Sequence, residues 1–397
     1  MNDKINSLWG NKGIRYAVIA LLAAMALVSL IQGVRNAAGA SQDFQWDAAK
    51  AFTMRINPYD ESLHPSGVLD AYGFDEVYLQ MEANQFPSLL MLLIPYTFLD
   101  PLPARYAWIV SNLLFTAGII LLLRKTFLKK ADRDVFIAFM LFMIAGTPYR
   151  NQLGVGQHSL FALFFFLLAV WFDEREDKKE QEEGRKSYTL IAATVFCLFV
   201  CYFKYTLTVP LCQYFIYRKK YMQIVVSALM HVVLTVVSAW WLNDSIPNMI
   251  IKPLQVAGAL ASEGCIDFGV VFRGSVLAYA AAFAVMAVLF VMAVKLPPDR
   301  ELDYISVLTL WSLIITYHRI YDFFLLIIVL AYFISRERSI YYKAGYAAAL
   351  ISVFFVLRIF SESPGSKLVT GILYYAFTVA VTVEIFNKGV LYERKRR

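Results

Sequence analysis

Residues 188–220 read YTLIAATVFCLFVCYFKYTLTVPLCQYFIYRKK, and this stretch decides how the chain crosses a membrane. It is almost entirely apolar, with Lys204 near its middle and Arg218, Lys219 and Lys220 at its end. A single tilted helix would carry this basic cluster to the side of the membrane opposite the preceding basic loop. Two short helices joined at Lys204 keep both clusters on one side, as the positive-inside rule requires. We therefore predict a helical hairpin with Lys204 at its tip.

The composition of the whole chain is that of a membrane protein. Of its 397 residues, 59% are hydrophobic and 17% are charged, whereas about 25% are charged in a typical soluble domain. Apolar runs such as 222–241 and 276–294 approach the length needed to cross about 30 Å of hydrocarbon. The sequence therefore predicts an all-α polytopic membrane protein that forms a single integral membrane domain over residues 1–397.

The distribution of basic residues predicts about twelve transmembrane helices, with both termini in the cytoplasm. Most of the 37 Lys and Arg residues fall on one side when the chain is threaded in this way. The expected location is the cytoplasmic (inner) membrane. The net charge of +7 then reflects basic residues in the short cytoplasmic loops and does not indicate nucleic-acid binding. The expected spans are 14–33, 104–123, 134–147, 157–172, 188–203, 205–217, 221–242, 270–294, 304–317, 321–334, 340–358 and 368–386.

Two connecting segments differ in character. Residues 34–103 form the expected extracytoplasmic loop, with short interfacial helices that include the apolar stretch from Phe86 to Asp100. Residues 173–187 form an expected charged cytoplasmic loop that is solvated and carries no chemistry. The first apolar run precedes Ala38-Gly39-Ala40, which resembles a signal-peptidase site. It is long for a signal peptide, so we interpret it as an uncleaved first helix.

Three pairs of short helices are expected to carry polar tips. The segments are 134–172, 188–217 and 304–334, with tips at 147–158, at Lys204 and at 317–322. Helices of 12 to 16 residues rise only about 18–24 Å, so their tips should lie below the membrane surface. Non-helical backbone at that depth is tolerated where it is buried in protein or lines a wet cavity. We predict one polar chamber that opens outward beneath the 34–103 loop.

Structural alternatives exist for each polar tip residue. Lys204 alternatively snorkels to lipid headgroups, and His318 alternatively caps a helix or satisfies a backbone carbonyl. Arg319 and Asp322 have the spacing of a simple ion pair. His158 stands at a helix start, where a capping or packing role is common. Three such tips on one face nevertheless favour a functional site, because ionisable residues within a membrane are costly.

The first outer loop contains a candidate general base. Residues 43–52 are typical of a short amphipathic helix, with Asp43 and Asp47 on its polar face. Asp43 is either a helix N-cap or a base that accepts a proton from an alcohol. We expect Asp47 to be a solvated neighbour that pairs with Lys50.

An outward-facing chamber receives activated groups mainly on lipid carriers, because nucleotide sugars and ATP are not supplied there. A polyprenyl-phosphate sugar fits such a site. Its phosphate would be stabilised by Lys204 and His318, with Arg319 or Arg150 as further cations, while Asp43 deprotonates the acceptor hydroxyl. One base without a carboxylate nucleophile implies a single displacement with inversion.

Other polar and aromatic residues are candidates for sugar or acceptor binding, although aromatic side chains are common at membrane interfaces without a ligand. No ligand spacing demands a metal, and no cofactor is required. Sharing of a divalent ion by Asp43, Asp47 and the donor phosphate stays open. The sugar and acceptor candidates are Trp46, Asp47, Tyr59, Gln157, His158 and Tyr321.

A series of short motifs in a fixed order resembles glycosyltransferase family 87, the polyprenyl-phosphate-mannose-dependent α-1,2-mannosyltransferases of the GT-C superfamily. The likeness covers most of residues 14–220. Its motifs are Asp43-Phe44, Ala48-Ala49, Asn57-Pro58-Tyr59, Phe86-Pro87-Ser88 with Pro95 and Trp108, Gly156-Gln157-His158, and Lys204 between Phe203 and Tyr205.

This resemblance implies an outward-facing site with Asp43 as base, Lys204 near the lipid phosphate, and His318 in the same site. The enzyme would be a hexosyltransferase acting on a glycan or glycolipid acceptor, with mannose as the family default. The chain departs from the family at Ser88, where Pro is frequent, and at His158, where Asn is frequent. Both departures leave the sugar and acceptor open. The rival hypotheses are a lipid-linked sugar flippase or transporter and a non-catalytic assembly subunit.

Overall fold

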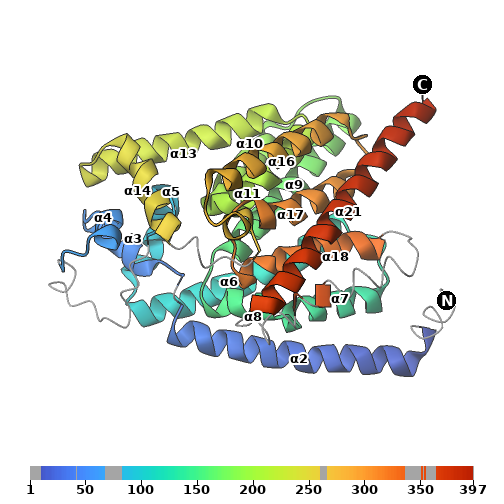
Figure 1. Cartoon of the computed structure of the whole chain (residues 1–397), viewed down its shortest axis with the longest axis horizontal. Coiled ribbons are helices and arrows are strands. Elements are labelled where there is room, and N and C mark those ends of the chain that lie inside the picture. The colour runs from blue at the N-terminus through green and yellow to red at the C-terminus, as the bar shows by residue number, and fades with distance from the viewer. Residues whose placement is uncertain are drawn as a thin grey trace.

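The computed structural model describes residues 10–41, 43–67, 83–259, 266–335, 350–351, 353–354 and 364–396. The secondary structure of these described residues is helical (Figure 1). The first half contains α2 (Lys12–Gly39), α3 (Trp46–Thr53), α4 (Pro58–Leu63), α5 (Pro87–Leu93), η2 (Ile94–Phe98), α6 (Pro101–Thr126), α7 (Arg133–Ala145), α8 (Thr147–Gly154) and α9 (Ser159–Glu183). The second contains α10 (Tyr188–Cys201), η3 (Tyr202–Lys204), α11 (Tyr205–Leu211), α12 (Gln213–Tyr217), α13 (Tyr221–Leu242), α14 (Ile246–Ala259), α15 (Phe268–Val271), α16 (Val276–Lys295), α17 (Glu301–Ile315), η5 (Ile320–Leu325), α18 (Leu326–Ser335) and α21 (Pro364–Arg396).

The stretch that opens the sequence analysis folds as the predicted hairpin. Lys204 leaves the helical region, with φ −102° and ψ 67°, and the chain then turns back toward the start of α10. Arg218, just after α12, lies 3.0 Å from Asp173 on α9 and also pairs with Glu301 at the start of α17. These contacts define one end of the bundle, which we call the basic end. Both α2 and α21 also have a terminus there (Figure 1).

Two further hairpins have their tips next to Lys204. The first consists of α7, α8 and α9, with a bend of 108° between α8 and α9. In the second, α17 and α18 are joined through η5. Thr316, just after α17, donates its hydroxyl hydrogen to the Thr206 carbonyl at 2.7 Å. The three predicted tips therefore lie together in the interior, as expected from the shortness of their helices.

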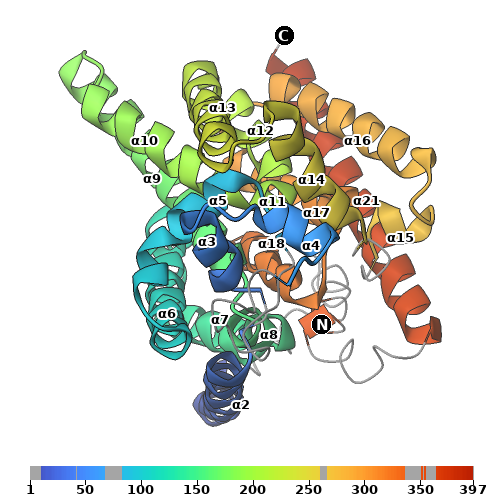
Figure 2. The same cartoon turned by 90° about the vertical axis from the view of Figure 1, so that its left-hand side faces the viewer.

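The opposite end of the bundle, which we call the loop end, carries α3, α4, α5 and α14 (Figures 1 and 2). Phe86 to Asp100 forms α5 and η2 and does not span the bundle. Leu89, Leu90 and Leu93 of α5 are fully buried against neighbouring helices. The ring of Phe86 lies 4.6 Å from that of Tyr205, so this part of the first loop covers the Lys204 tip. Residues 68–82 of the loop lie outside the described residues.

By length and composition, six helices in the described part of the chain can cross a membrane, or seven if α8 and α9 form one broken span. The predicted count of twelve is not confirmed, because most hairpin helices are too short to qualify separately. One qualifying segment, Tyr188–Leu211, contains the turn at Lys204. Most of the predicted span 340–358 lies outside the described residues. The several long apolar helices indicate that the chain is a multi-pass membrane protein.

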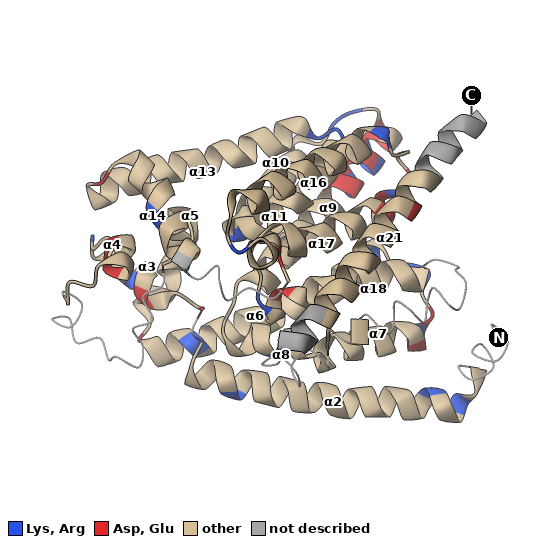
Figure 3. Cartoon of the chain, viewed as in Figure 1, with Lys and Arg blue, Asp and Glu red and all other residues tan. Residues whose placement is uncertain are grey.

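The charged segment 173–187 differs from the expected solvated loop. Helix α9 continues to Glu183, and Asp173 and Glu176 are buried. Lys220 explains this difference, because its ammonium lies 2.7 Å from Glu176 and 3.1 Å from Asp173. Charged residues gather toward the two ends of the bundle, and the ribbon between them consists mostly of uncharged residues (Figure 3).

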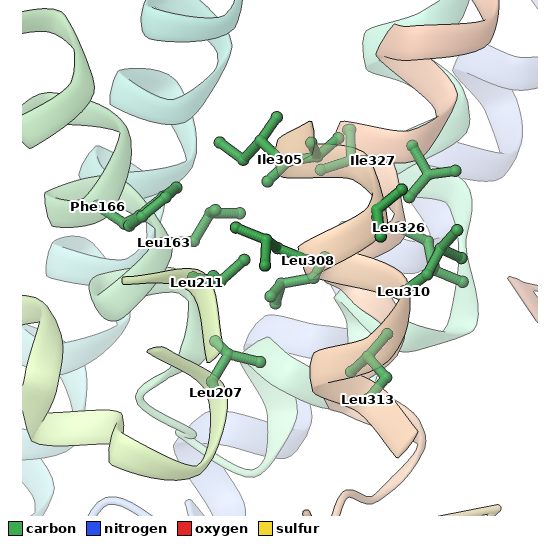
Figure 4. Packing of buried hydrophobic residues seen from close by; sticks show 14 of the residues in the cluster. Leu163, Phe166, Leu207, Leu211, Ile305, Leu308, Leu310, Leu313, Leu326 and Ile327 are labelled. Carbon is green, nitrogen blue, oxygen red and sulfur yellow. The ribbon is translucent and has the colours of Figure 1, made fainter. Parts of the chain in front are cut away.

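Apolar side chains of the hairpins form the core beneath the tips. Leu163 and Phe166 of α9 pack with residues of α11, α17 and α18 (Figure 4). Lipid tails are as apolar as these side chains, so close van der Waals packing, more than burial from water, stabilises such a bundle. The residues packed with them include Leu207, Leu211, Ile305, Leu308, Leu310, Leu313, Leu326 and Ile327.

Candidate active site

Asp43 is joined to two hairpin tips by hydrogen bonds. The Gln157 side-chain amide donates to its carboxylate at 3.1 Å and to the Tyr321 hydroxyl at 3.0 Å. Tyr321 also hydrogen-bonds to Asp43. The backbone N–H of Asp43 donates to the Val155 carbonyl at 2.7 Å. The first loop is therefore held against the α8–α9 and α17–α18 tips at this carboxylate.

Gly156 makes this close approach possible. Its φ of +71° lies in the left-handed region that favours glycine. A Cβ there would stand 3.3 Å from Phe44 and from Ser41, which is tighter than ordinary packing. The turn therefore needs glycine for both its conformation and its contact with the chain around Asp43.

Lys204 lies in the same centre. Lys204 is only 4% exposed, so the alternative that its side chain snorkels to lipid headgroups is wrong. The ammonium lies 3.3 Å from the Asp322 carboxylate and 5.5 Å from the centroid of the Tyr321 ring. Tyr321 thus contacts Lys204 through its ring and Asp43 through its hydroxyl. This places the cation and the candidate base around one aromatic side chain.

Asp322 is the central residue that the sequence analysis missed. It accepts a hydrogen bond from Ser159, pairs with Lys204, and lies 2.8 Å from Nδ1 of His318. The alternative that Arg319 and Asp322 form an ion pair is wrong, because Asp322 pairs with Lys204 and Arg319 donates to the Tyr317 hydroxyl at 2.6 Å. The available signal was Lys204 itself, because a lysine buried in an apolar hairpin needs a carboxylate partner.

His318 is fully buried and has partners at both ring nitrogens. Nδ1 contacts Asp322, and Nε2 lies 3.0 Å from both the Thr316 hydroxyl and the Ser312 carbonyl. The alternative that it satisfies a backbone carbonyl is therefore confirmed. Its contacts suit a residue that orients Asp322 more than one that touches a phosphate directly.

Asp43 differs from Asp322 in its exposure. Asp43 is half-buried, whereas Asp322 is 2% exposed. Burial raises the pKa of Asp43 above its usual value, while the positive charges of Lys204 and Arg319 and the Tyr321 hydrogen bond oppose that rise. A raised pKa makes a carboxylate a stronger base, and partial access lets a substrate reach it.

Several predicted sugar-binding residues are structural parts of the first loop. The Trp46 indole N–H donates to the Tyr96 carbonyl at 3.1 Å, and Tyr59 is fully buried with its hydroxyl on the Gln85 carbonyl. Asp47 is buried as well, so the expected solvated pair with Lys50 is wrong. The packing of the loop against the bundle buries this segment on both of its faces, since Ala48 and Phe52 are buried as well.

Two other predicted residues have structural contacts of their own. Arg150 donates to the Gln32 side chain at 2.6 Å, so it points toward α2. His158 is 1% exposed, hydrogen-bonds to the Phe44 backbone and lies 5.3 Å from the Trp108 ring centroid. These contacts give His158 the packing role considered from the sequence. Of the Gly156-Gln157-His158 motif, Gln157 is the residue that bonds to Asp43.

Metal-ligand geometry occurs elsewhere among the described residues. Asp173, Glu176 and Asp177 are close enough to hold an ion, but Arg218 and Lys220 already bind these carboxylates at the basic end. This arrangement is an ion-pair network that joins α9 to the chain after α12 at the basic end.

A largely apolar groove of about 570 Å³ is lined in part by residues close to Lys204 in the sequence. It runs between α11–α12 and α13, and Tyr202 and Tyr205 line it on either side of Lys204 in the sequence. His231 forms a polar bridge in its wall, with Nδ1 at 2.9 Å from the Ser88 hydroxyl and Nε2 at 2.8 Å from the Phe199 carbonyl.

The fold and the site together define a multi-pass helical membrane protein in which Asp43 of the first loop and Lys204 lie together at the tips of three hairpins. Residues 87–251 match the family model of glycosyltransferase family 87. This match confirms the resemblance over α5 to α14, which includes Gln157 and Lys204, and indicates a membrane glycosyltransferase. The matched segment is under half of the chain and does not include Asp43 or Asp322. No curated protein and no solved structure matches the chain significantly.

Proposed function

We propose that this protein transfers a hexose from a polyprenyl-phosphate sugar to a glycan or glycolipid acceptor, with inversion at the sugar. The observation that carries the proposal is the convergence of Asp43 and Lys204 around Tyr321. The family match supports a sugar donor and an acceptor as substrates. Mannose is the family default for the transferred sugar.

In the proposed reaction, the acceptor hydroxyl oxygen attacks the sugar carbon that carries the phosphate. The bond from this carbon to the phosphate oxygen breaks, and polyprenyl phosphate leaves with the electron pair. Asp43 takes the hydroxyl proton. Lys204 neutralises the charge that grows on the phosphate, with Arg319 as the second cation. Fixed charges in a site shielded from water stabilise such a transition state more strongly than they would in bulk water.

The groove lined by Tyr202 and Tyr205, which flank Lys204 in the sequence, supports a donor carried on a lipid. Its wall is apolar and contains Val209, Ile216 and Val232, which suit an isoprenoid chain. A donor with its chain there and its phosphate at Lys204 would present the sugar toward Asp43. Gln157 is positioned to contact the sugar or acceptor because its amide already lies beside Asp43.

The proposed orientation follows from the positive-inside rule. The basic end lies in the cytoplasm with both termini, and the loop end lies on the extracytoplasmic side of the cytoplasmic membrane. The hairpin tips then belong to a chamber reached from outside beneath the first loop. About twelve segments enter the membrane in this arrangement, although the short hairpin helices do not each cross it.

The direct test is transfer by purified protein in lipid nanodiscs, with a radiolabelled polyprenyl-phosphate hexose and a glycolipid acceptor. We expect Asp43→Asn to lower turnover by about 10²- to 10⁴-fold, the usual contribution of a general base. Asp60→Asn is the matched control, since Asp60 is a carboxylate of the same loop that bonds to Lys252. Wild-type turnover by Asp43→Asn would exclude Asp43 as the base. Movement of labelled lipid across liposomes without transfer to an acceptor would favour a flippase.

A further inference from the structure

Asp322 connects all three hairpin tips. It bonds to Ser159 at the start of α9, to Lys204 at the α10–α11 turn, and to His318 just before η5. The residue is 2% exposed, and both oxygens of its carboxylate have partners. Neither oxygen is therefore open to an acceptor hydroxyl, which separates the role of Asp322 from that of Asp43.

We infer that Asp322 is a positioning residue that fixes the Lys204 ammonium where the donor phosphate binds. This inference rests on the proposed function. A lysine ammonium is a compact charge on a flexible stem, with three rotatable N–H donors and no preferred direction of its own. Among the described residues, the acidic partner of Lys204 is Asp322. One N–H directed at Asp322 sets the direction of the others.

The partners of Asp322 hold it in turn. His318 is anchored at Nε2 by the Ser312 carbonyl and the Thr316 hydroxyl, at 3.0 Å each. The Thr316 hydroxyl hydrogen is directed to the Thr206 carbonyl, two residues beyond Lys204. The contacts from Lys204 through Asp322, His318 and Thr316 therefore lead back to the turn that carries Lys204. A buried, hydrogen-bonded network of this kind keeps a side chain in one position.

The charge of Asp322 also matters to phosphate recognition. A neutral amide at this position would leave Lys204 buried without its ion-pair partner, free to follow the phosphate to a different position. Asp322→Asn should therefore impair donor binding and turnover while sparing recognition of the acceptor. A residue that only stabilised the fold would lower the amount of folded protein and leave the affinity of the remaining folded protein unchanged.

The test measures binding of polyprenyl phosphate, without a sugar, to the full-length protein in nanodiscs, together with separate KM values for donor and acceptor. We expect Asp322→Asn to raise the Kd for this lipid and the donor KM by about 10- to 100-fold, as for loss of one member of a buried charge pair. The acceptor KM should change less than threefold. Asp322→Glu should recover part of the affinity, since it restores the charge.

Asp303→Asn provides a matched control, because Asp303 is a fully buried carboxylate paired with Arg300 at the basic end. It should bind the lipid with wild-type affinity. If Asp322→Asn does not fold, Ser159→Ala carries the test with an expected rise in Kd of about three- to tenfold.

The outcomes separate the two claims. Wild-type protein that neither binds polyprenyl phosphate nor transfers the sugar would overturn the proposed function. Wild-type protein that does both, beside folded Asp322→Asn or Ser159→Ala protein with unchanged Kd and donor KM, would overturn the positioning role alone.

Discussion

Replacing Lys204 by methionine should destabilise the fold as well as impair donor use. Lys204 and Asp322 have side chains only 5% and 3% exposed, and their charged groups are 3.3 Å apart. Removing one partner of a buried ion pair typically costs about 3–5 kcal/mol, because the other charge is left uncompensated. Asp322 keeps its contacts with His318 and Ser159, so we expect a loss near 3 kcal/mol.

A double-mutant cycle isolates this interaction. Asp322→Asn combined with Lys204→Met removes both charges, and the two single losses should fail to add by about 1–3 kcal/mol. The assay is equilibrium unfolding in mixed micelles, followed by tryptophan fluorescence. Lys252→Met is the control, since Lys252 bridges Asp60 and Asp244 near the surface, where such pairs contribute about 0–1 kcal/mol. Wild-type stability of Lys204→Met, or strict additivity in the cycle, would refute this account of the centre.

Three other expectations follow from the same contacts. Activity should fall in acid as Asp43 gains a proton, and the fall should occur above the usual carboxyl range because burial raises the pKa of Asp43. Lys204→Met should move this acidic limb of the kcat/KM profile to still higher pH, because the positive charge of Lys204 lowers the pKa of Asp43. Ala228→Trp in the groove should raise the KM for a long-chain donor, with no change for a donor of two isoprene units. Gly156→Ala should cost about 1–2 kcal/mol in unfolding measurements, because its φ of +71° is left-handed; an unchanged value would contradict the strained turn.

Lys204 illustrates what the sequence predicted well. Its place in an apolar stretch, with basic residues at Arg218 to Lys220, required a turn at depth, and the structure has that turn. Depth in the membrane depends on the pattern of apolar and basic residues, which a single sequence displays. The gathering of the three tips followed from the shortness of their helices, so the neighbourhood of Asp43 and Lys204 was also predictable.

The direction in which each side chain points was less predictable. Arg150 is on a predicted tip but faces α2, and Asp47 is in the predicted loop but is buried. Local spacing offered Arg319 as an alternative partner for Asp322, whereas its partners Lys204 and Ser159 come from distant segments. Such pairings depend on how separate hairpins pack, and local spacing carries no information about that packing.

The central claim is that the donor phosphate binds at Lys204 while its sugar faces Asp43. A cryo-EM structure of the protein in nanodiscs with bound polyprenyl phosphate tests it most directly. We predict a phosphate oxygen within about 4 Å of the Lys204 ammonium, the usual limit of an ion pair, and an isoprenoid chain along Tyr205 and Val232. A phosphate bound instead at Arg150 or at the Arg218 network of the basic end would contradict the account.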